Sequence, residues 1–167
     1  ACQIKTLKQA VDATHFNNEY FIQHRRGIAE GGTRFLNVLQ GSDWETAETW
    51  YQAVKHLPTE GWAMGGNNMR DADLMLRRLI TLRDDKLLEP GRDLIHFLGT
   101  SKLEWAVLLT DIQRAIRKYV NPSFTISFDC ASPFLATANG QVYHHIDLPH
   151  NDKWCYRMSP IEIGRAS

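Results

Sequence analysis

The sequence is short of the features that mark several protein classes. Its formal net charge is zero over 167 residues, so the overall charge cannot drive nucleic-acid binding, and any such contact needs a local patch. Its three cysteines, Cys2, Cys130 and Cys155, include no Cys-x-x-Cys pair, which excludes a disulfide framework and indicates a reducing compartment. No apolar run approaches the roughly 20 residues that cross a bilayer, and no signal peptide is evident. We therefore expect a cytoplasmic protein without a membrane partner.

The chain does contain an ordinary apolar fraction of 43%, enough for the core of one domain. Four short apolar runs are separated by segments with helical periodicity. The runs are Arg34 to Gly41, Gly61 to Gly66, Asp93 to Thr100 and Phe124 to Pro133. This alternation predicts an α/β fold of four βα units with parallel strands.

The expected domain organisation follows from the same spacing. We expect the four units to occupy residues 1–143, and an irregular polar tail to follow over residues 144–167. Four βα units are half of an eight-stranded barrel, which typically needs about 200 residues or more. Such a half leaves two unpaired strand edges, so the chain either pairs with another half, folds as an open sheet, or is a fragment.

The strand ends are the expected location of a functional site, because parallel strands bring their C-terminal ends to one edge of the sheet. At that edge we expect Gln40, Gly65, Gly66, Gly99 and Asp129. Asp129 is suited to act as a nucleophile, a general base or a metal ligand, and equally to cap a helix or order a loop. The Gln40 amide suits the edge of a planar heterocycle or a simple turn, and the glycines allow a close ligand approach or a tight turn.

The C-terminal histidines and the arginines of the helical segments are not expected to form a functional site. His144, His145, His150 and Cys155 lie near one another in the sequence, but the paired-ligand spacing of zinc sites is missing. We therefore expect no metal and no cofactor. We interpret the arginines of the helical segments as solvated surface residues. They are Arg77, Arg78, Arg83, Arg114 and Arg117.

Taken in order, the endings of the four runs resemble the second half of the tRNA-guanine transglycosylase family. The matching steps are Leu39-Gln40-Gly41, Ala63-Met64-Gly65-Gly66, Phe97-Leu98-Gly99 and Asp129-Cys130-Ala131-Ser132-Pro133, with Asn139-Gly140 ten and eleven residues past Asp129. The resemblance covers about Thr6 to Tyr143. It implies the C-terminal half of a TIM barrel, in an enzyme that exchanges a guanine in a nucleic acid for a 7-deazaguanine.

The resemblance also implies roles for individual residues. Asp129 would be the nucleophile that attacks the anomeric carbon of the sugar and holds a covalent glycosyl intermediate. Gln40 and the backbone around Gly66, with Gly65 and Gly99 beside them, would form the base-binding site. Leu98 would be an apolar wall against the face of the base, which must first leave its stack.

Two departures from the family pattern imply DNA in preference to tRNA as the substrate polymer. Leu135 and Ala138 stand where the family carries RNA-contacting arginines, and the cysteine-rich zinc signature is absent. In both respects the chain is similar to the divergent phage and bacterial branch that inserts 7-deazaguanines into DNA. The first barrel half, with the general-base and base-reading aspartates, would come from another chain or barrel half.

Two other interpretations stay open at this stage. The chain is a non-catalytic half-barrel that acts as an accessory or scaffold protein, which the zero net charge, the missing arginines and the missing half favour. Alternatively, it is an unrelated α/β protein with a phosphate site near Gly65 or Gly99.

Overall fold

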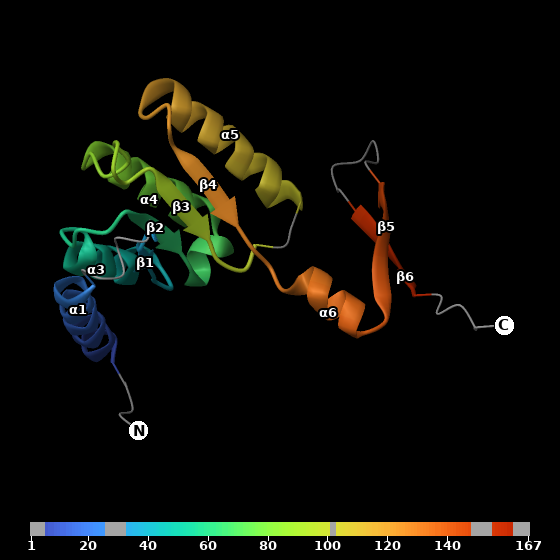
Figure 1. Ribbon diagram of the computed structural model, residues 1–167, viewed down its shortest axis with the longest axis horizontal. Helices are drawn as coiled ribbons and strands as arrows, with labels where there is room; N and C mark the ends of the chain where they lie inside the picture. Colours follow the sequence, from blue (N-terminus) through green and yellow to red (C-terminus); the bar gives the residue numbers. More distant parts are fainter. Residues whose placement is uncertain (1–5, 26–32, 101–102, 148–154, 162–167) are drawn as a thin grey trace.

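Four parallel strands form the main sheet of the computed structural model, which describes residues 6–25, 33–100, 103–147 and 155–161. The strands are β1 (Leu36–Leu39), β2 (Gly61–Met64), β3 (Leu94–Phe97) and β4 (Thr125–Phe128). They pair in chain order, each parallel to the next (Figure 1). Each strand lies within one of the four apolar runs, so the predicted α/β fold with parallel strands is confirmed.

Helices alternate with the strands along the chain. They are α1 (Leu7–His24), α3 (Trp44–Val54), α4 (Ala72–Asp84), α5 (Leu103–Tyr119) and α6 (Ser132–Ala138), with a short 3-10 helix, η1 (Gly66–Met69). Thr6, Asp43 and Asp71 cap α1, α3 and α4, because each side chain accepts hydrogen bonds from backbone N–H groups of the first turn. None of the described helices is both long and apolar enough to cross a bilayer.

One face of the main sheet is buried beneath α3, α4 and α5. Alternate strand residues face these helices: Leu39, Trp62, Met64, Ile95 and Phe97, all at most 2% exposed. The helices contribute Tyr51, Val54, Met75, Leu79, Leu82 and Leu109 to the same core. Burying a side chain of this size contributes about 1.5–3 kcal/mol. The core therefore fixes the strands, and with them the loops at the strand ends.

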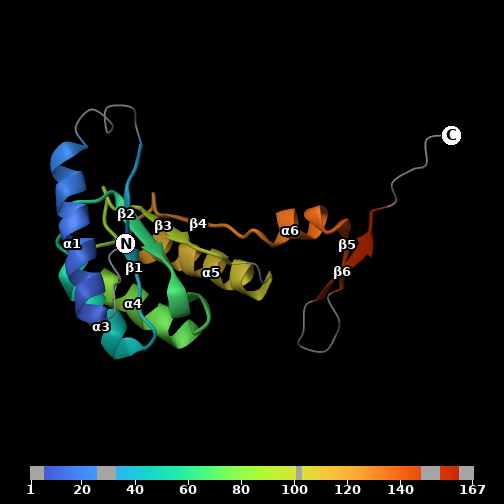
Figure 2. The same cartoon turned by 90° about the horizontal axis from the view of Figure 1, so that it is seen from below.

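The opposite face of the sheet carries Val38, Ala63, His96 and Ser127, which are register partners across the four strands. Among the described residues, no helix covers this face: α3, α4 and α5 lie on the other side of the sheet, and α1 packs beside α3 (Figure 2). The outer edges of β1 and β4 pair with no other described strand. All-parallel sheets are normally covered on both faces, whereas the part of this chain that the structure describes covers only one.

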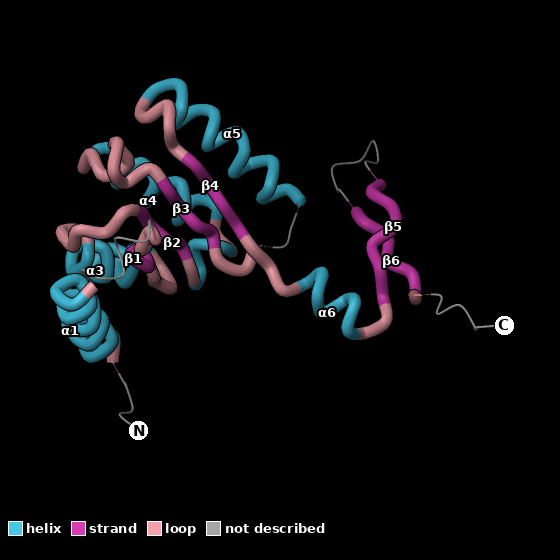
Figure 3. The backbone as a smooth tube through the Cα atoms, viewed as in Figure 1, coloured by secondary structure: helices cyan, strands magenta, loops and turns pink. Residues whose placement is uncertain are grey.

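The segment after α6 forms an antiparallel hairpin of β5 (Gln141–Asp147) and β6 (Cys155–Pro160) (Figure 3). The prediction of an irregular tail is therefore wrong for these residues, and the expected boundary at residue 143 falls within β5. The pairing register shifts between Tyr143 and His145. The resulting bulge breaks the two-residue alternation by which strands are found in a sequence, which explains the error.

Candidate functional site at the strand ends

The residues that follow the four strands emerge along one edge of the main sheet. Gln40 follows β1, Gly65 follows β2, Leu98 follows β3 and Asp129 follows β4. The last residues of neighbouring strands are register partners, so the four segments leave the sheet side by side. The structure thus places every predicted strand-end residue at the expected edge.

The Gln40 side chain lies against a stretch of backbone without side chains. A Cβ atom added at Gly65 would lie 3.9 Å from Gln40 Oε1 and 3.3 Å from Leu98 Cδ1, and one at Gly66 would lie 3.4 Å from Gln40 Oε1. Gly66 also has a φ of +63°, in the left-handed region that favours glycine. Gln40 and Leu98 are both exposed. An amide, an apolar side chain and glycine backbone therefore meet at the ends of the first three strands.

Asp129 is held at the end of β4 by two contacts to one carboxylate oxygen. Its Oδ1 accepts a hydrogen bond from the Gly99 backbone N–H at 3.2 Å and lies 3.2 Å from His96 Nε2. Gly99 has a φ of +73°, a conformation that a side chain would strain. The Asp129 side chain remains 64% exposed, and Oδ2 makes no hydrogen bond to the described residues. The carboxylate is thus oriented through Oδ1 and open to a ligand through Oδ2.

His96 links Asp129 to Ser127 on the uncovered face of the sheet. Its Nδ1 lies 2.9 Å from Ser127 Oγ, while Nε2 faces the carboxylate. One neutral tautomer satisfies both contacts, with the Ser127 hydroxyl donating to Nδ1 and Nε2–H donating to Asp129. The histidine ring is 25% exposed, so packing on β3 restricts its position. This Ser127–His96–Asp129 chain of contacts gives the carboxylate a defined orientation.

Sequence reasoning did not select His96 or Ser127. Both lie inside apolar runs, at positions that read as ordinary strand residues. One signal was present: Ser127 and Asp129 are two residues apart, and such residues point to the same face of a strand. The pairing of Ser127 with His96 depends on the β3–β4 register, which only the structure provides.

The residues around Gln40 and the residues around Asp129 adjoin one another at the end of β3. Leu98 contacts the Gly65 side of the edge, and the next residue, Gly99, donates to Asp129. A ligand lying against Leu98 would therefore have the Gln40 amide on one side and the Asp129 carboxylate on the other. A planar ring with polar edges fits this arrangement, because its faces need apolar contact and its edges need hydrogen bonds.

Asp43, the carboxylate nearest in sequence to Gln40, serves a structural role. Hydrogen bonds from the Thr46 backbone N–H and from the Ser42 and Thr46 hydroxyls lower the pKa of Asp43 below its ordinary value. Its oxygens are engaged in capping α3. Asp129 is therefore the better candidate for covalent chemistry at this edge.

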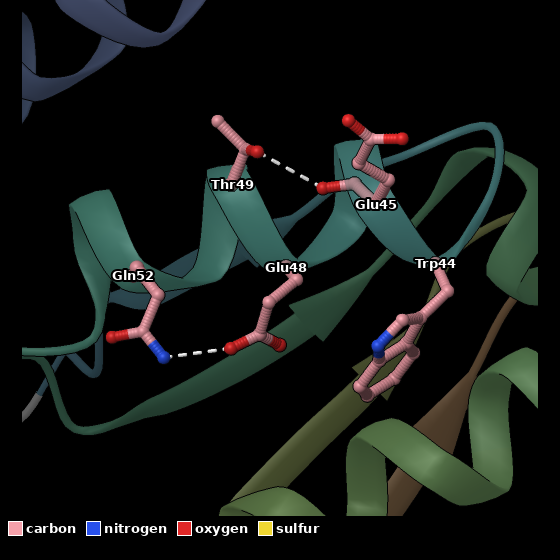
Figure 4. A pocket seen from close by; sticks show the side chains of 5 residues that line it. All are labelled: Trp44, Glu45, Glu48, Thr49 and Gln52. Carbon is pink, nitrogen blue, oxygen red and sulfur yellow. Dashed lines mark hydrogen bonds between the residues drawn. The ribbon is translucent and has the colours of Figure 1, made fainter.

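An open hollow on the surface of α3 offers no comparable chemistry. It is lined by Trp44, Glu45, Glu48, Thr49 and Gln52 (Figure 4). Gln52 Nε2 donates to Glu48 Oε1 at 2.7 Å, and the Thr49 hydroxyl donates to the Glu45 carbonyl oxygen at 2.9 Å. Gln52, Glu48 and Thr49 thus already have polar partners, and none of the lining residues belongs to the strand ends.

The histidines of the hairpin take no part in the strand-end site. His144 and His145 lie on β5 and are exposed. His150 lies outside the described residues, as does the side chain of Cys155. Comparison of the chain with protein-family models, with curated proteins and with solved structures finds no match. An assignment of function therefore depends on the chemistry of the strand ends.

Proposed function

We propose that the chain is the C-terminal half of a TIM-type barrel that exchanges guanine for a 7-deazaguanine in DNA, or in tRNA, through a covalent aspartyl-glycosyl intermediate. The observation that carries the proposal is the state of Asp129. Its carboxylate is fixed through Oδ1 and open through Oδ2, and it lies on the same edge of the sheet as the Gln40 amide and the apolar Leu98 side chain, two groups suited to a purine. The order of the strand-end motifs along the chain, described from the sequence, supports the same function.

The proposed reaction has two displacements at the anomeric carbon. In the first, an Asp129 oxygen bonds to the carbon as its bond to guanine N9 breaks, and the departing guanine takes up a proton. In the second, the incoming 7-deazaguanine loses a proton from the equivalent nitrogen, bonds to the carbon and releases the carboxylate. The group that moves these protons would belong to the completing half of the barrel.

The base-binding role falls to the residues around Gly65 and Gly66. The Gln40 amide both donates and accepts hydrogen bonds, as recognition of a guanine-like edge requires. A side chain at residue 65 would contact Leu98 and Gln40, so glycine lets both side chains lie close to the backbone. Leu98 is 40% exposed despite being apolar, which suits a residue that is covered when a base lies against it.

The completing half is a requirement of the fold as well as of the chemistry. The uncovered sheet face and the unpaired edges of β1 and β4 match the inner face and the seams of a half-barrel. Four further βα units, from another chain or barrel half, would cover that face and pair with both edges. The nucleic-acid strand that carries the target guanine would then meet Asp129 in a site shielded from bulk water. This shielding favours attack by the incoming base over hydrolysis.

The test is base exchange into duplex DNA and into tRNA, measured with labelled guanine or 7-deazaguanine and with both barrel halves present. Asp129→Asn keeps the shape of the side chain but removes the nucleophile, so exchange should fall by several orders of magnitude. Gln40→Ala should mainly weaken base binding, by about 1–3 kcal/mol for the lost hydrogen bonds. Asp111→Asn is the matched control, because Asp111 is an exposed aspartate on α5 away from the strand ends. Full exchange by Asp129→Asn would remove Asp129 from the mechanism.

A non-catalytic accessory or scaffold role is the second candidate. The observations that favour it are the zero net charge and the presence of Leu135 and Ala138 where the resembled family carries arginines. On this alternative the chain binds the completing half through its open sheet, and Asp129→Asn has no consequence for the assembly's function. An assembled protein without exchange on either polymer would favour this role.

A further inference from the structure

Three metal-ligating side chains meet where α1 packs beside α3, away from the strand ends. His15 and Glu19 lie one turn apart on α1, and His56 follows the end of α3. The Nε2 atoms of the two histidines are 3.3 Å apart, and His15 Nδ1 lies 3.4 Å from Glu19 Oε2. One ligand atom from each residue lies within 4.8 Å of the others, and this is the one such group found among the described residues.

The 3.3 Å distance between the two Nε2 atoms is the distance expected between two ligands of one metal ion. Imidazole nitrogens bind zinc at about 2.0–2.1 Å, which places two tetrahedral ligands about 3.3–3.4 Å apart. The rings are tilted by 41° with centroids 5.3 Å apart, so they are not stacked face to face. An ion between the two Nε2 atoms would therefore require little movement of either ring.

Glu19 prepares His15 for this role. Metal-binding histidines usually donate their second ring N–H to a carboxylate, which fixes the tautomer and leaves the other nitrogen free to bind. The Glu19 carboxylate lies 3.4 Å from Nδ1 of His15, so its charge favours a proton on that nitrogen, which would leave the Nε2 lone pair on the side of His56 for an ion. His15 is 32% exposed and Glu19 49% exposed, so an ion and its waters can reach the site without opening the fold.

We propose that His15 and His56 bind one first-row transition-metal ion, such as Zn²⁺, through their Nε2 atoms, with Glu19 orienting His15 and water completing the coordination. Imidazole ligands favour Zn²⁺, Cu²⁺ and Ni²⁺ over the oxygen-preferring Mg²⁺ and Ca²⁺. The ion would join α1 to the βα unit that contains α3. This site is independent of the strand-end residues and of the proposed base exchange.

The consequence of binding is greater stability, because the ion binds only where the two histidines are held together. Other contacts join the C-terminal end of α1 to its neighbours. They include the edge-to-face pair Phe21–Phe35 and the ion pair between Arg25 and Glu60. The ion would add a link near the middle of α1, where His15 lies.

The test is titration of the whole chain with Zn²⁺ by calorimetry, together with thermal unfolding and the visible absorption of bound Co²⁺. We expect one ion per chain and an unfolding temperature that rises with free Zn²⁺ but not with Mg²⁺. His15→Ala and His56→Ala should each abolish both effects, and Glu19→Gln should weaken binding by about 10- to 100-fold. His24→Ala is the matched control, because His24 lies on the same helix but outside the group.

Two outcomes would overturn the proposal. Zn²⁺ binding that survives unchanged in both His15→Ala and His56→Ala would place the ion elsewhere, for example at His96 and Asp129. Absence of binding to the intact chain would show that the two imidazoles are joined only by a hydrogen bond. Circular dichroism of each variant without metal separates loss of the site from loss of the fold, and Glu19→Gln retains both histidines as a second measure.

Discussion

Neutralising Glu48 should destabilise the protein more than removing the arginine that it faces. Arg78 on α4 is only 1% exposed, and its Nη2 lies 3.0 Å from Glu48 Oε2 on α3. Their alignment is too poor for a hydrogen bond, so the contact is one between charges. The guanidinium carbon also lies 4.1 Å from the centroid of the Tyr51 ring and 4.9 Å from that of Trp44. Burial lowers the pKa of Arg78, and Glu48 opposes that shift.

The expected magnitudes follow from this asymmetric burial. Glu48→Gln leaves a buried cation without its counter-charge, so we expect a loss of about 1–3 kcal/mol in the free energy of unfolding. Arg78→Met loses cation–π contacts of about 0.5–2 kcal/mol. It leaves no buried charge, and the Glu48 carboxylate can turn to water, so we expect the free energy of unfolding to fall by about 1 kcal/mol or less. In the double variant the Glu48→Gln loss should disappear, so the coupling energy equals that loss, about 1–3 kcal/mol.

Urea unfolding followed by circular dichroism and by tryptophan fluorescence measures all four proteins of this cycle. In thermal unfolding, each kcal/mol should appear as a shift of about 2–4 °C. Asp111→Asn breaks an exposed ion pair with Arg114 and should leave the midpoint almost unchanged. Additivity within about 0.3–0.5 kcal/mol would refute the reasoning, because it would mean that Arg78 does not depend on its counter-charge.

Two further predictions concern the site and pH. His96→Gln keeps an amide donor near the position of Nε2, which contacts Asp129, whereas His96→Asn keeps a donor only near Nδ1. Base exchange by the assembled protein should therefore fall about 10- to 100-fold in the Asn variant and much less in the Gln variant. Equal losses in both, with Asp129 intact, would deny His96 an orienting role. Burial tends to raise the pKa of Glu60, but hydrogen bonds from Arg25 and from the Phe35 backbone N–H lower it below its ordinary 4.5. The stabilising contribution of Glu60 should be fully present above pH 4.5 and lost as pH falls through its lowered pKa. The free energy of unfolding of Glu60→Gln should therefore fall less steeply in acid than that of the unaltered protein. An unchanged acid profile would contradict the assignment.

The strands and most helices were predictable because their determinants are local. Apolar runs between helical segments identify the strands, and residues such as Asp43 and Asp71 mark helix starts. Arg78 shows where local reasoning fails: an arginine on a helix is normally solvated, yet this one is buried against Tyr51 and Trp44. Its burial depends on how α3 packs against α4, which a sequence pattern does not specify.

The strand-end site divides in the same way. Gln40, Gly65 and Asp129 follow apolar runs directly, so their common edge could be predicted from parallel pairing alone. His96 becomes part of the site only through the register of β3 with β4, and a slip of one residue would turn it to the other face. Cross-strand partners of this kind are not visible in one sequence.

In the main sheet every strand pairs only with the strands next to it in the chain order. The stability of each βα unit should therefore depend mainly on its immediate neighbours, as it does in repeat proteins. The inner strands β2 and β3 each have two neighbours and should exchange their amide hydrogens most slowly, while β1 and β4 should fray first. Docking of further strands would turn these two ends into interior units, so the largest gain in protection should occur in the strands that precede Gln40 and Asp129.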